Sequence, residues 1–196
     1  MALKRRTFRR PTGVRRYRKL FIIAAEGAKT EPQYFTALGS QQATIRPLKG
    51  RNKSSPQHVL KRMEEYLKGE SLRKSDEAWL VVDKDQWTDD QLGELHRWAQ
   101  KADNYGLALS NPSFEYWVLL HFEDGTGISS ARACTNRLRE HLPDYDKGID
   151  ARKITQPMIG EAIRRAKLRD NPPCADWPRA LGGTTVYRLV ERITQA

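Results

Sequence analysis

The stretch LFIIAAEG, residues 20–27, sets the fold class, because its first six residues form an uninterrupted apolar run of strand length. A run of this kind is typical of a parallel strand that is covered on both faces. A second such run, AWLVV at residues 78–82, is followed by Asp83, Lys84 and Asp85. Both runs predict central strands of one sheet, and acidic residues follow both.

Helices are expected between these runs. Two capping boxes, Thr30 with Gln33 and Thr88 with Gln91, predict helix starts. The expected helices cover residues 30–39, 55–68 and 88–102, and weaker strands cover residues 43–48 and 107–109. Strands that alternate with helices are typical of βαβ units and a parallel sheet.

From residue 111 onward the pattern predicts helices only. They cover residues 112–122, 129–141, 156–169 and 184–193. We therefore expect an α/β fold with an open, mostly parallel sheet flanked by helices and a helical C-terminal layer. The expected organisation is one compact domain, made of a basic arm (residues 1–19), an α/β core (20–110) and the helical part (111–196).

Positive charge is concentrated in the basic arm. The chain has 35 Lys and Arg against 24 Asp and Glu, a net charge of +11, and nine of the basic residues precede Leu20. Such a segment repels itself and is expected to be disordered without a polyanion, so we expect it to bind nucleic acid. A solubility tail or a contact for an acidic protein is the alternative. The basic residues expected to contact substrate are Arg5, Arg6, Arg9, Arg10, Arg15, Arg16, Arg18 and Lys19.

Composition excludes several classes of protein. No apolar run approaches ~18 residues, so no membrane span is expected. The first twenty residues lack the apolar region of a signal peptide, and the two cysteines, Cys134 and Cys174, are too far apart for a CxxC motif. We therefore expect a cytoplasmic protein with neither a disulfide scaffold nor a cysteine zinc site. The chain also has no GxxxxGK[ST] motif, so any associated ATPase must be a separate protein.

The acids after the two apolar runs are candidate metal ligands. Asp83 and Asp85 are two residues apart, so an extended chain points them to the same side. Glu26 joins them if the two strands are neighbours, because parallel strands lie ~5 Å apart. Three carboxylates at one place need a cation, and Mg²⁺ or Mn²⁺ prefers such oxygen ligands. The alternative is that these are ordinary loop residues.

The expected helix at residues 112–122 carries two further candidates. This helix is apolar all round and therefore predicted to be buried, so Glu115 needs a cation, a metal or hydrogen-bond donors, or keeps its proton. His121 is either a core histidine or a proton shuttle. Asn111 is expected to cap the helix; alternatively, Ser110 and Asn111 bind a phosphate at its start.

Several motifs together resemble a known family. They are the basic arm, FIIAAEGAKTEPQYF (residues 21–35), VVDKDQW (81–87), LSNPSFEYWVLLHF (109–122) and LPDYDK (142–147), with a looser match at TTVYRLVERI (184–193). Glu26 with the Asp83–Asp85 pair resembles the magnesium site of TOPRIM domains in topoisomerases, primases and some nucleases. The whole set is similar to the RloB family, bacterial TOPRIM-related proteins encoded near restriction and phage-defence genes. Residues 171–183 are longer and richer in proline than this pattern.

The resemblance implies a TOPRIM-like fold and a metal-dependent nuclease that acts on DNA or RNA. It also implies a site role for Glu31, although a glutamate in the first turn of a helix also has a purely structural explanation. Lys147 would stabilise charge on the reacting phosphate. A non-catalytic nucleic-acid-binding or partner-regulating module with a structural ion is the main alternative, and a primase-type transferase is a third.

Overall fold

In the part of the chain that the structure describes, five strands form one sheet in the order β2-β1-β3-β4-β5. The structure is a computed structural model that describes residues 17–50, 55–84, 87–146 and 148–196. The strands are β1 (Lys19–Ala25), β2 (Ala43–Leu48), β3 (Glu77–Asp83), β4 (Tyr105–Asn111) and β5 (Gly183–Thr184). The first four are parallel and β5 is antiparallel to β4. The expected open, mostly parallel sheet is therefore confirmed.

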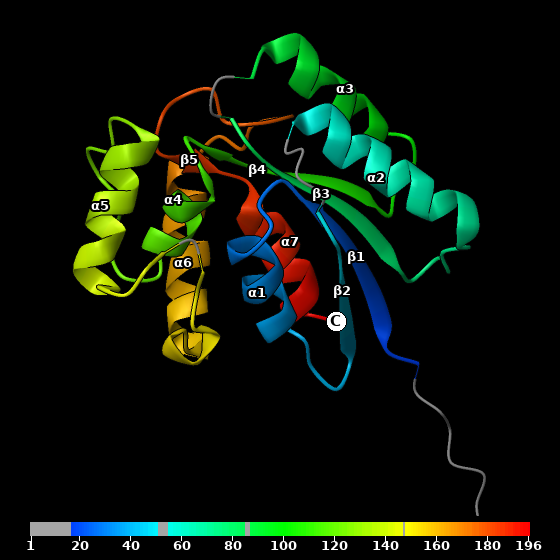
Figure 1. The fold of residues 1–196 in the computed structure, drawn as a ribbon, viewed down its shortest axis with the longest axis horizontal. Coiled ribbons are helices and arrows are strands. Elements are labelled where there is room, and N and C mark those ends of the chain that lie inside the picture. The colour runs from blue at the N-terminus through cyan, green and yellow to red at the C-terminus, as the bar shows by residue number, and fades with distance from the viewer. Residues whose placement is uncertain (1–16, 51–54, 85–86, 147) are drawn as a thin grey trace, which may run out of the picture.

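Helices cover both faces of this sheet (Figure 1). They are α1 (Thr30–Ala37), α2 (Pro56–Gly69), α3 (Asp89–Ala99), α4 (Phe114–Leu119), α5 (Ala131–His141), α6 (Gln156–Arg169) and α7 (Val186–Thr194), with a short 3₁₀ helix at Ala151–Lys153. Helices α2 and α3 lie on one face, and the remaining helices lie on the other. The sheet thus separates two apolar layers, and the expected helical C-terminal layer is one of them.

The central strand β1 shows why the apolar runs are uninterrupted. Phe21 and Ile23 pack into the layer that contains α1 and α4, whereas Ile22 and Ala24 pack into the layer of α2 and α3. All four side chains are completely buried. Because successive side chains of a strand point to opposite faces, only an apolar run satisfies both layers.

The expectation that only helices follow residue 111 is wrong. Residues 183 and 184 add a short edge strand, in which Thr184 pairs with Ser110 of β4. The preceding proline-rich segment crosses the edge of the sheet, since α6 belongs to one layer and Trp177 is buried in the other. Gly182, at φ +78°, turns the chain back toward β4. A strand of two residues has no periodicity by which the sequence alone would reveal it.

Three other local predictions are also wrong. Thr30 does not cap α1, which begins after Lys29; its hydroxyl lies 3.2 Å from that of Tyr145. Asn111 does not cap α4, because it is still the last residue of β4 and Ser113 precedes the helix. Lys19 belongs to β1 and not to a free arm. In each case a tertiary contact replaces the local interaction that the sequence pattern predicted.

The capping box that opens α3 is confirmed. The Thr88 hydroxyl accepts a hydrogen bond from the Gln91 N–H, and the Gln91 side chain accepts one from the Thr88 N–H. No helix in the described part of the chain is both long and apolar enough to cross a membrane. Residues 1–16, which hold most of the expected basic arm, lie outside the described residues.

Candidate carboxylate site

Glu26 and Asp83 lie side by side at the carboxyl ends of β1 and β3. The two strands are neighbours, and the Glu26 N–H donates to the Val81 carbonyl at 2.9 Å. The Glu26 carboxylate in turn accepts a hydrogen bond from the Asp83 N–H, at 3.2 Å. This arrangement follows from the two apolar runs, because parallel strands of similar length end at the same edge of the sheet.

Trp87 holds the other oxygen of the same carboxylate. Its indole N–H donates to Glu26 Oε1 at 3.2 Å. Trp87 is in turn contacted by Lys84, whose ammonium group donates to the Trp87 carbonyl at 2.6 Å and pairs with Asp89 at 3.1 Å. We did not predict Trp87 as a site residue, although VVDKDQW contains it and an aromatic residue after two acids was an available signal.

Glu31 brings a further carboxylate to this place from α1. Its side chain is only 5% exposed, and Oε1 accepts a hydrogen bond from the Gly27 N–H at 2.8 Å. A Cβ atom on residue 27 would lie 2.1 Å from Glu31 Oε2, so only glycine allows this approach. The pair Glu26–Gly27 at the end of β1 therefore leaves room for the Glu31 carboxylate.

Asp83 is the point at which these charges act together. Burial raises the pKa of Asp83 well above its usual range, and the negative charges of Glu31, Glu115 and Glu26 raise it further. A hydrogen bond from the backbone of Phe114 opposes the shift only in part. Like charges that converge on a desolvated carboxyl favour its protonated form, unless a cation is present.

Glu115 closes the site from α4 and is held by two hydroxyl groups. Ser113 donates to Glu115 Oε2 at 2.6 Å, and Tyr145 donates to Oε1 at 2.9 Å. The Tyr145 hydroxyl has one proton, so it accepts a hydrogen bond from Thr30 at 3.2 Å. Glu115 is half-buried and not fully buried. The sequence left open a cation, a metal or hydrogen-bond donors as partners of Glu115, and the structure provides hydrogen-bond donors.

The donor atoms of these residues are of the type that a hard divalent cation prefers. The carboxylates described around Asp83 supply only oxygen donors, which Mg²⁺ and Mn²⁺ prefer, and a cation would relieve their repulsion. Within the described ranges, however, no three His, Cys, Asp or Glu side chains are gathered closely enough to hold a metal ion. Asp85, the third predicted metal ligand, lies outside these ranges.

Ser110 and Asn111 have structural contacts within the protein. The Ser110 hydroxyl lies 2.8 Å from that of Thr184, which joins β4 to β5. The Asn111 amide donates to the carbonyls of Pro178 and Arg179, at 3.3 and 2.9 Å, so it anchors the proline-rich segment. Both side chains are buried. Their predicted role in binding phosphate receives no support from these contacts.

His121 has the contacts of a core histidine. It is 3% exposed, its Nδ1 lies 3.1 Å from two backbone carbonyls, and its Nε2 lies 3.1 Å from the Tyr34 hydroxyl. With the proton on Nδ1, Nε2 accepts from Tyr34. Burial lowers the pKa of His121 to about 4, so the ring is neutral at pH 7. Of the two readings of His121, these contacts match the core histidine.

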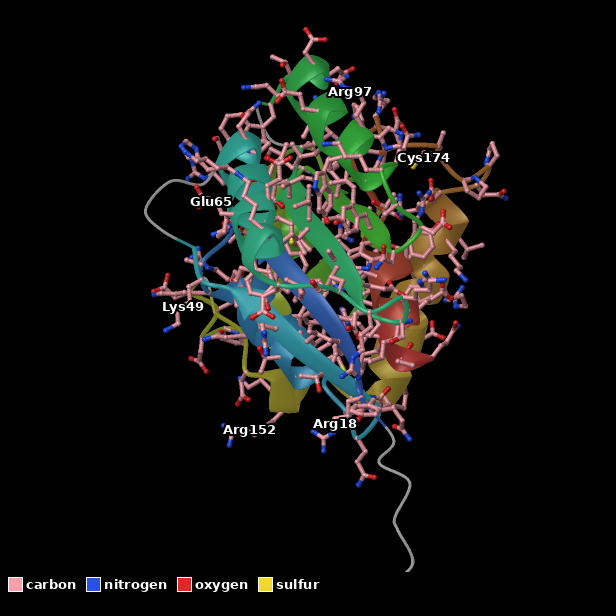
Figure 2. The ribbon with its side chains drawn as sticks, turned by 90° about the vertical axis from the view of Figure 1, so that its right-hand side faces the viewer. Arg18, Lys49, Glu65, Arg97, Arg152 and Cys174 are labelled. Atoms are coloured by element: carbon pink, nitrogen blue, oxygen red, sulfur yellow. The ribbon has the colours of Figure 1, made fainter. Side chains whose placement is uncertain are left out.

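The predicted basic contacts are only partly described. Lys147 and the basic residues from Arg5 to Arg16 lie outside the described residues, and Arg18 is exposed. Lys19 pairs with Glu77 at 2.7 Å, at the end of β1 opposite Glu26. Figure 2 shows Arg18 at the foot of the sheet, where the described chain begins. The basic arm therefore joins the protein at the far end from the carboxylates.

Comparison with known proteins identifies a family but no individual relative. No curated protein and no solved structure matches the chain. The family model described as RloB-like protein matches residues 21–193. This range includes the described carboxylates Glu26, Glu31, Asp83 and Glu115, and it covers most of the sequence. The chain therefore belongs to the RloB family.

Proposed function

We propose that this chain is a metal-dependent nuclease of TOPRIM type that cleaves phosphodiester bonds in DNA or RNA. The observation that carries the proposal is the meeting of Glu26 and Asp83 at the carboxyl ends of two neighbouring parallel strands, where the charges of Glu31 and Glu115 also act on Asp83. Ligand sites of open α/β sheets lie at this edge. Perturbed carboxyl groups concentrate where chemistry takes place.

Glu26, Asp83 and Asp85 would hold Mg²⁺ or Mn²⁺. A divalent ion bound there would lower the pKa of a coordinated water molecule and offset negative charge on the scissile phosphate. In the protein itself, Trp87 and the Asp83 N–H fix the orientation of the Glu26 carboxylate. Such fixed orientation is what a ligand set needs in order to favour one geometry.

Glu115 would complete the metal shell or act as a general base. The hydroxyls of Ser113 and Tyr145 hold its two oxygens in place. Tyr145 also links Glu115 to Thr30 at the start of α1. Lys147 lies outside the described residues, and its role in stabilising charge on the reacting phosphate is part of the proposal.

The basic arm would hold the nucleic acid backbone. Although it joins the protein at the opposite end of β1, a strand of seven residues is only ~23 Å long. A chain of 16 residues can span up to ~55 Å, so a substrate that extends along the protein can meet both regions. The proposal extends to a role in the bacterial cytoplasm, in defence against phage and with a separately encoded ATPase of the same locus, as the resemblance to the family implies.

A non-catalytic module that binds nucleic acid is the second candidate. It is favoured by the hydrogen bonds that the described carboxylates accept from other groups of the protein. The carboxylates of Glu31 and Glu115 accept hydrogen bonds from within the protein, as structural carboxylates do. In this case an ion would stabilise the loops, and nothing would be cut.

Cleavage assays separate the two candidates. Labelled single-stranded and double-stranded DNA and RNA are incubated with the protein in Mg²⁺, Mn²⁺ or EDTA. We expect cleavage with one of the metals and none in EDTA, and Asp83→Asn should lower the rate ~10³-fold because it removes charge from the site at constant shape. Asp103→Asn, at an exposed acid before β4, is the matched control and should keep full activity. Absence of cleavage with every substrate and metal would favour the binding module.

A further inference from the structure

A half-buried arginine lies beside the carboxylate site. Arg62 projects from α2, and its Nη2 donates to the carbonyl of Ala25 at 2.5 Å. Ala25 is the last residue of β1 and directly precedes Glu26. Side chains of a helix lean toward its N-terminus, so an arginine in the middle of α2 reaches the edge of the sheet where the strands end. The guanidinium therefore lies at the carboxyl end of β1, against the residue that directly precedes Glu26.

The contacts of Arg62 leave most of its donors unused. A guanidinium carries five N–H donors. Among the residues that the structure describes, Arg62 forms no ion pair, and its Nε is buried without a hydrogen-bond partner. Burial lowers the pKa of Arg62, which is the direction expected for a cation that loses water and gains no anion.

Arg188 shows how the same fold treats a structural arginine. It is also half-buried, but its guanidinium pairs with Asp170 at 2.8 Å and donates to the Cys174 carbonyl at 2.7 Å. Burial by itself would lower the pKa of Arg188, yet the bonds to Tyr187 and Asp170 raise it above its ordinary value. A carboxylate thus accompanies the structural arginine, whereas Arg62 has none in the described residues.

Two loops meet at the Arg62 guanidinium. A Cβ atom on Gly50 would lie 2.9 Å from Arg62 Nη1 and 3.9 Å from the Ala28 side chain, so the loops after β1 and β2 approach each other there. Lys29 and Lys49, one in each loop, are exposed. Figure 2 shows Lys49 at the margin of the molecule, away from the exposed Arg97 of α3. Each of these loops thus carries an exposed lysine next in sequence to the residue that approaches there, Ala28 or Gly50.

We propose that Arg62 binds a phosphate group at the carboxyl ends of β1 and β2, next to the carboxylate site. The planar guanidinium suits the two-pronged recognition of phosphate oxygens, and a partly desolvated guanidinium gains more from an anion than an exposed lysine does. That the phosphate belongs to a nucleic acid backbone rests on the proposed function. In that complex, Arg62 holds one phosphate of the strand while the carboxylates face its neighbour or the same group.

The first test uses the wild-type chain without metal. Inorganic phosphate is titrated in EDTA while the arginine Nε–Hε resonances are followed by NMR, and the Arg62 resonance is expected to shift in a saturable manner. Sodium chloride at equal ionic strength is the control. No response of Arg62 to phosphate would overturn the proposal, and this result does not depend on any substitution or on cleavage.

The second test identifies the source of the phosphate. Binding of inorganic phosphate and of 12-nucleotide single-stranded DNA and RNA is measured in EDTA for wild type, Arg62→Gln, Arg62→Lys and the control Arg97→Gln. Arg62→Gln should weaken oligonucleotide binding about tenfold or more, because a charged hydrogen-bonded pair is lost. Arg62→Lys retains the charge and should have a smaller effect, and Arg97→Gln should have none. If Arg62→Gln fails to fold, Arg62→Lys and the wild-type titration still decide the question.

The outcomes separate this proposal from the nuclease proposal. If Arg62 responds to phosphate but no substrate is cleaved, phosphate binding holds and the nuclease fails. If substrates are cleaved while Arg62→Gln binds them as wild type does, the nuclease holds and the role of Arg62 in holding the nucleic acid is overturned. Binding of inorganic phosphate without any effect of Arg62→Gln on oligonucleotides would restrict the site to a free phosphate ion.

Discussion

The two ends of β3 each carry a carboxyl group, and the fold treats them in opposite ways. At the start of the strand, Glu77 is 2% exposed and receives Lys19 at 2.7 Å, Arg192 at 3.0 Å and the indole N–H of Trp79 at 2.8 Å. At its end, Asp83 faces the negative charges of Glu31, Glu115 and Glu26. The same strand thus carries a carboxylate neutralised by cations at its start and a carboxyl group surrounded by negative charges at its end.

This difference separates a carboxylate with a structural role from the one that the proposed function uses. Burial of a carboxylate costs several kcal/mol, and the fold offsets this cost at Glu77 by bringing cations from β1 and α7. A protein selected for stability alone would do the same at Asp83. The repulsion at the end of β3 is instead retained, which is expected where a bound cation supplies the missing positive charge.

The largest effect on stability is expected from neutralising the two carboxyls in turn. Glu77→Gln removes the partner of two cations and should lower the free energy of unfolding by about 2 kcal/mol, less than for a fully buried pair because Lys19 and Arg192 remain partly exposed. Asp83→Asn removes a repelled charge and should leave the stability unchanged or raise it. Urea unfolding at pH 7 in EDTA measures both values.

Equal losses in the two variants would contradict the comparison. They would mean that the Asp83 carboxylate makes a stabilising contact in the metal-free protein, so that its neighbours do not act mainly as repelling charges. The comparison would be sharpened if Mg²⁺ stabilised wild type and Glu77→Gln but not Asp83→Asn, since only the end of β3 would then respond to the ion.

A change of pH is expected to have a smaller effect on folding stability, because Asp83 is no longer repelled by its negative neighbours once it takes up a proton. Its folded-state pKa is raised above the unfolded value of ~3.9, so the folded state binds this proton more tightly. The resulting stability is fully present below the unfolded pKa and is lost as pH rises through the folded pKa. The stability of metal-free wild type should therefore fall with rising pH above ~4 by more than that of Asp83→Asn.

Unfolding of both proteins between pH 5 and pH 8 measures this difference, and excess Mg²⁺ should abolish it. Parallel stability curves for the two proteins in EDTA would show that Asp83 is ionised in the folded state without cost. The neighbouring carboxylates would then lie too far away, or be too well solvated, to repel it.

The sequence predicts the framework of this site better than its supporting contacts. The apolar runs before Glu26 and Asp83 predict two buried parallel strands, and buried parallel strands bring their ends together, so the meeting of these two acids could be foreseen. The hydroxyl contacts of Glu115 could not be predicted from the sequence, since Tyr145 follows Glu115 by 30 residues and no local pattern links them. Arg62 gave no signal either, because its significance depends on the absence of a partner in the described residues.

Errors in the sequence-based account share one physical cause. Thr30 and Asn111 are good capping residues by type, but Thr30 contacts Tyr145 and Asn111 holds the segment at Pro178, so distant contacts replace the local ones. Lys19 resembles the rest of the basic arm in charge, yet it belongs to β1 and forms an ion pair with Glu77 of β3. Local propensity is a weak prior wherever a tertiary partner is available.

The smallest effect on the folded core is expected from removing the basic arm. Lys19 belongs to β1, and Tyr17 packs against the guanidinium of Arg73, 4.3 Å from its ring centroid, so the truncation should end at residue 16. It removes seven basic residues and no acid, and it should leave the unfolding free energy and Mg²⁺ binding unchanged. Affinity for nucleic acid should fall and depend less on salt. The slope of log K against log salt should decrease by ~0.9 for each lost contact to a duplex, or by ~0.7 for each lost contact to a single strand.

Replacing the same seven residues by Gln gives a control of equal length, which should match the truncation if charge alone matters. Salt titrations of binding in EDTA measure the slopes for all three proteins. Equal slopes would mean that nucleic acid is bound by the folded part of the chain, which includes Arg62 and the exposed Lys29 and Lys49, and that the arm is a solubility or protein-docking segment.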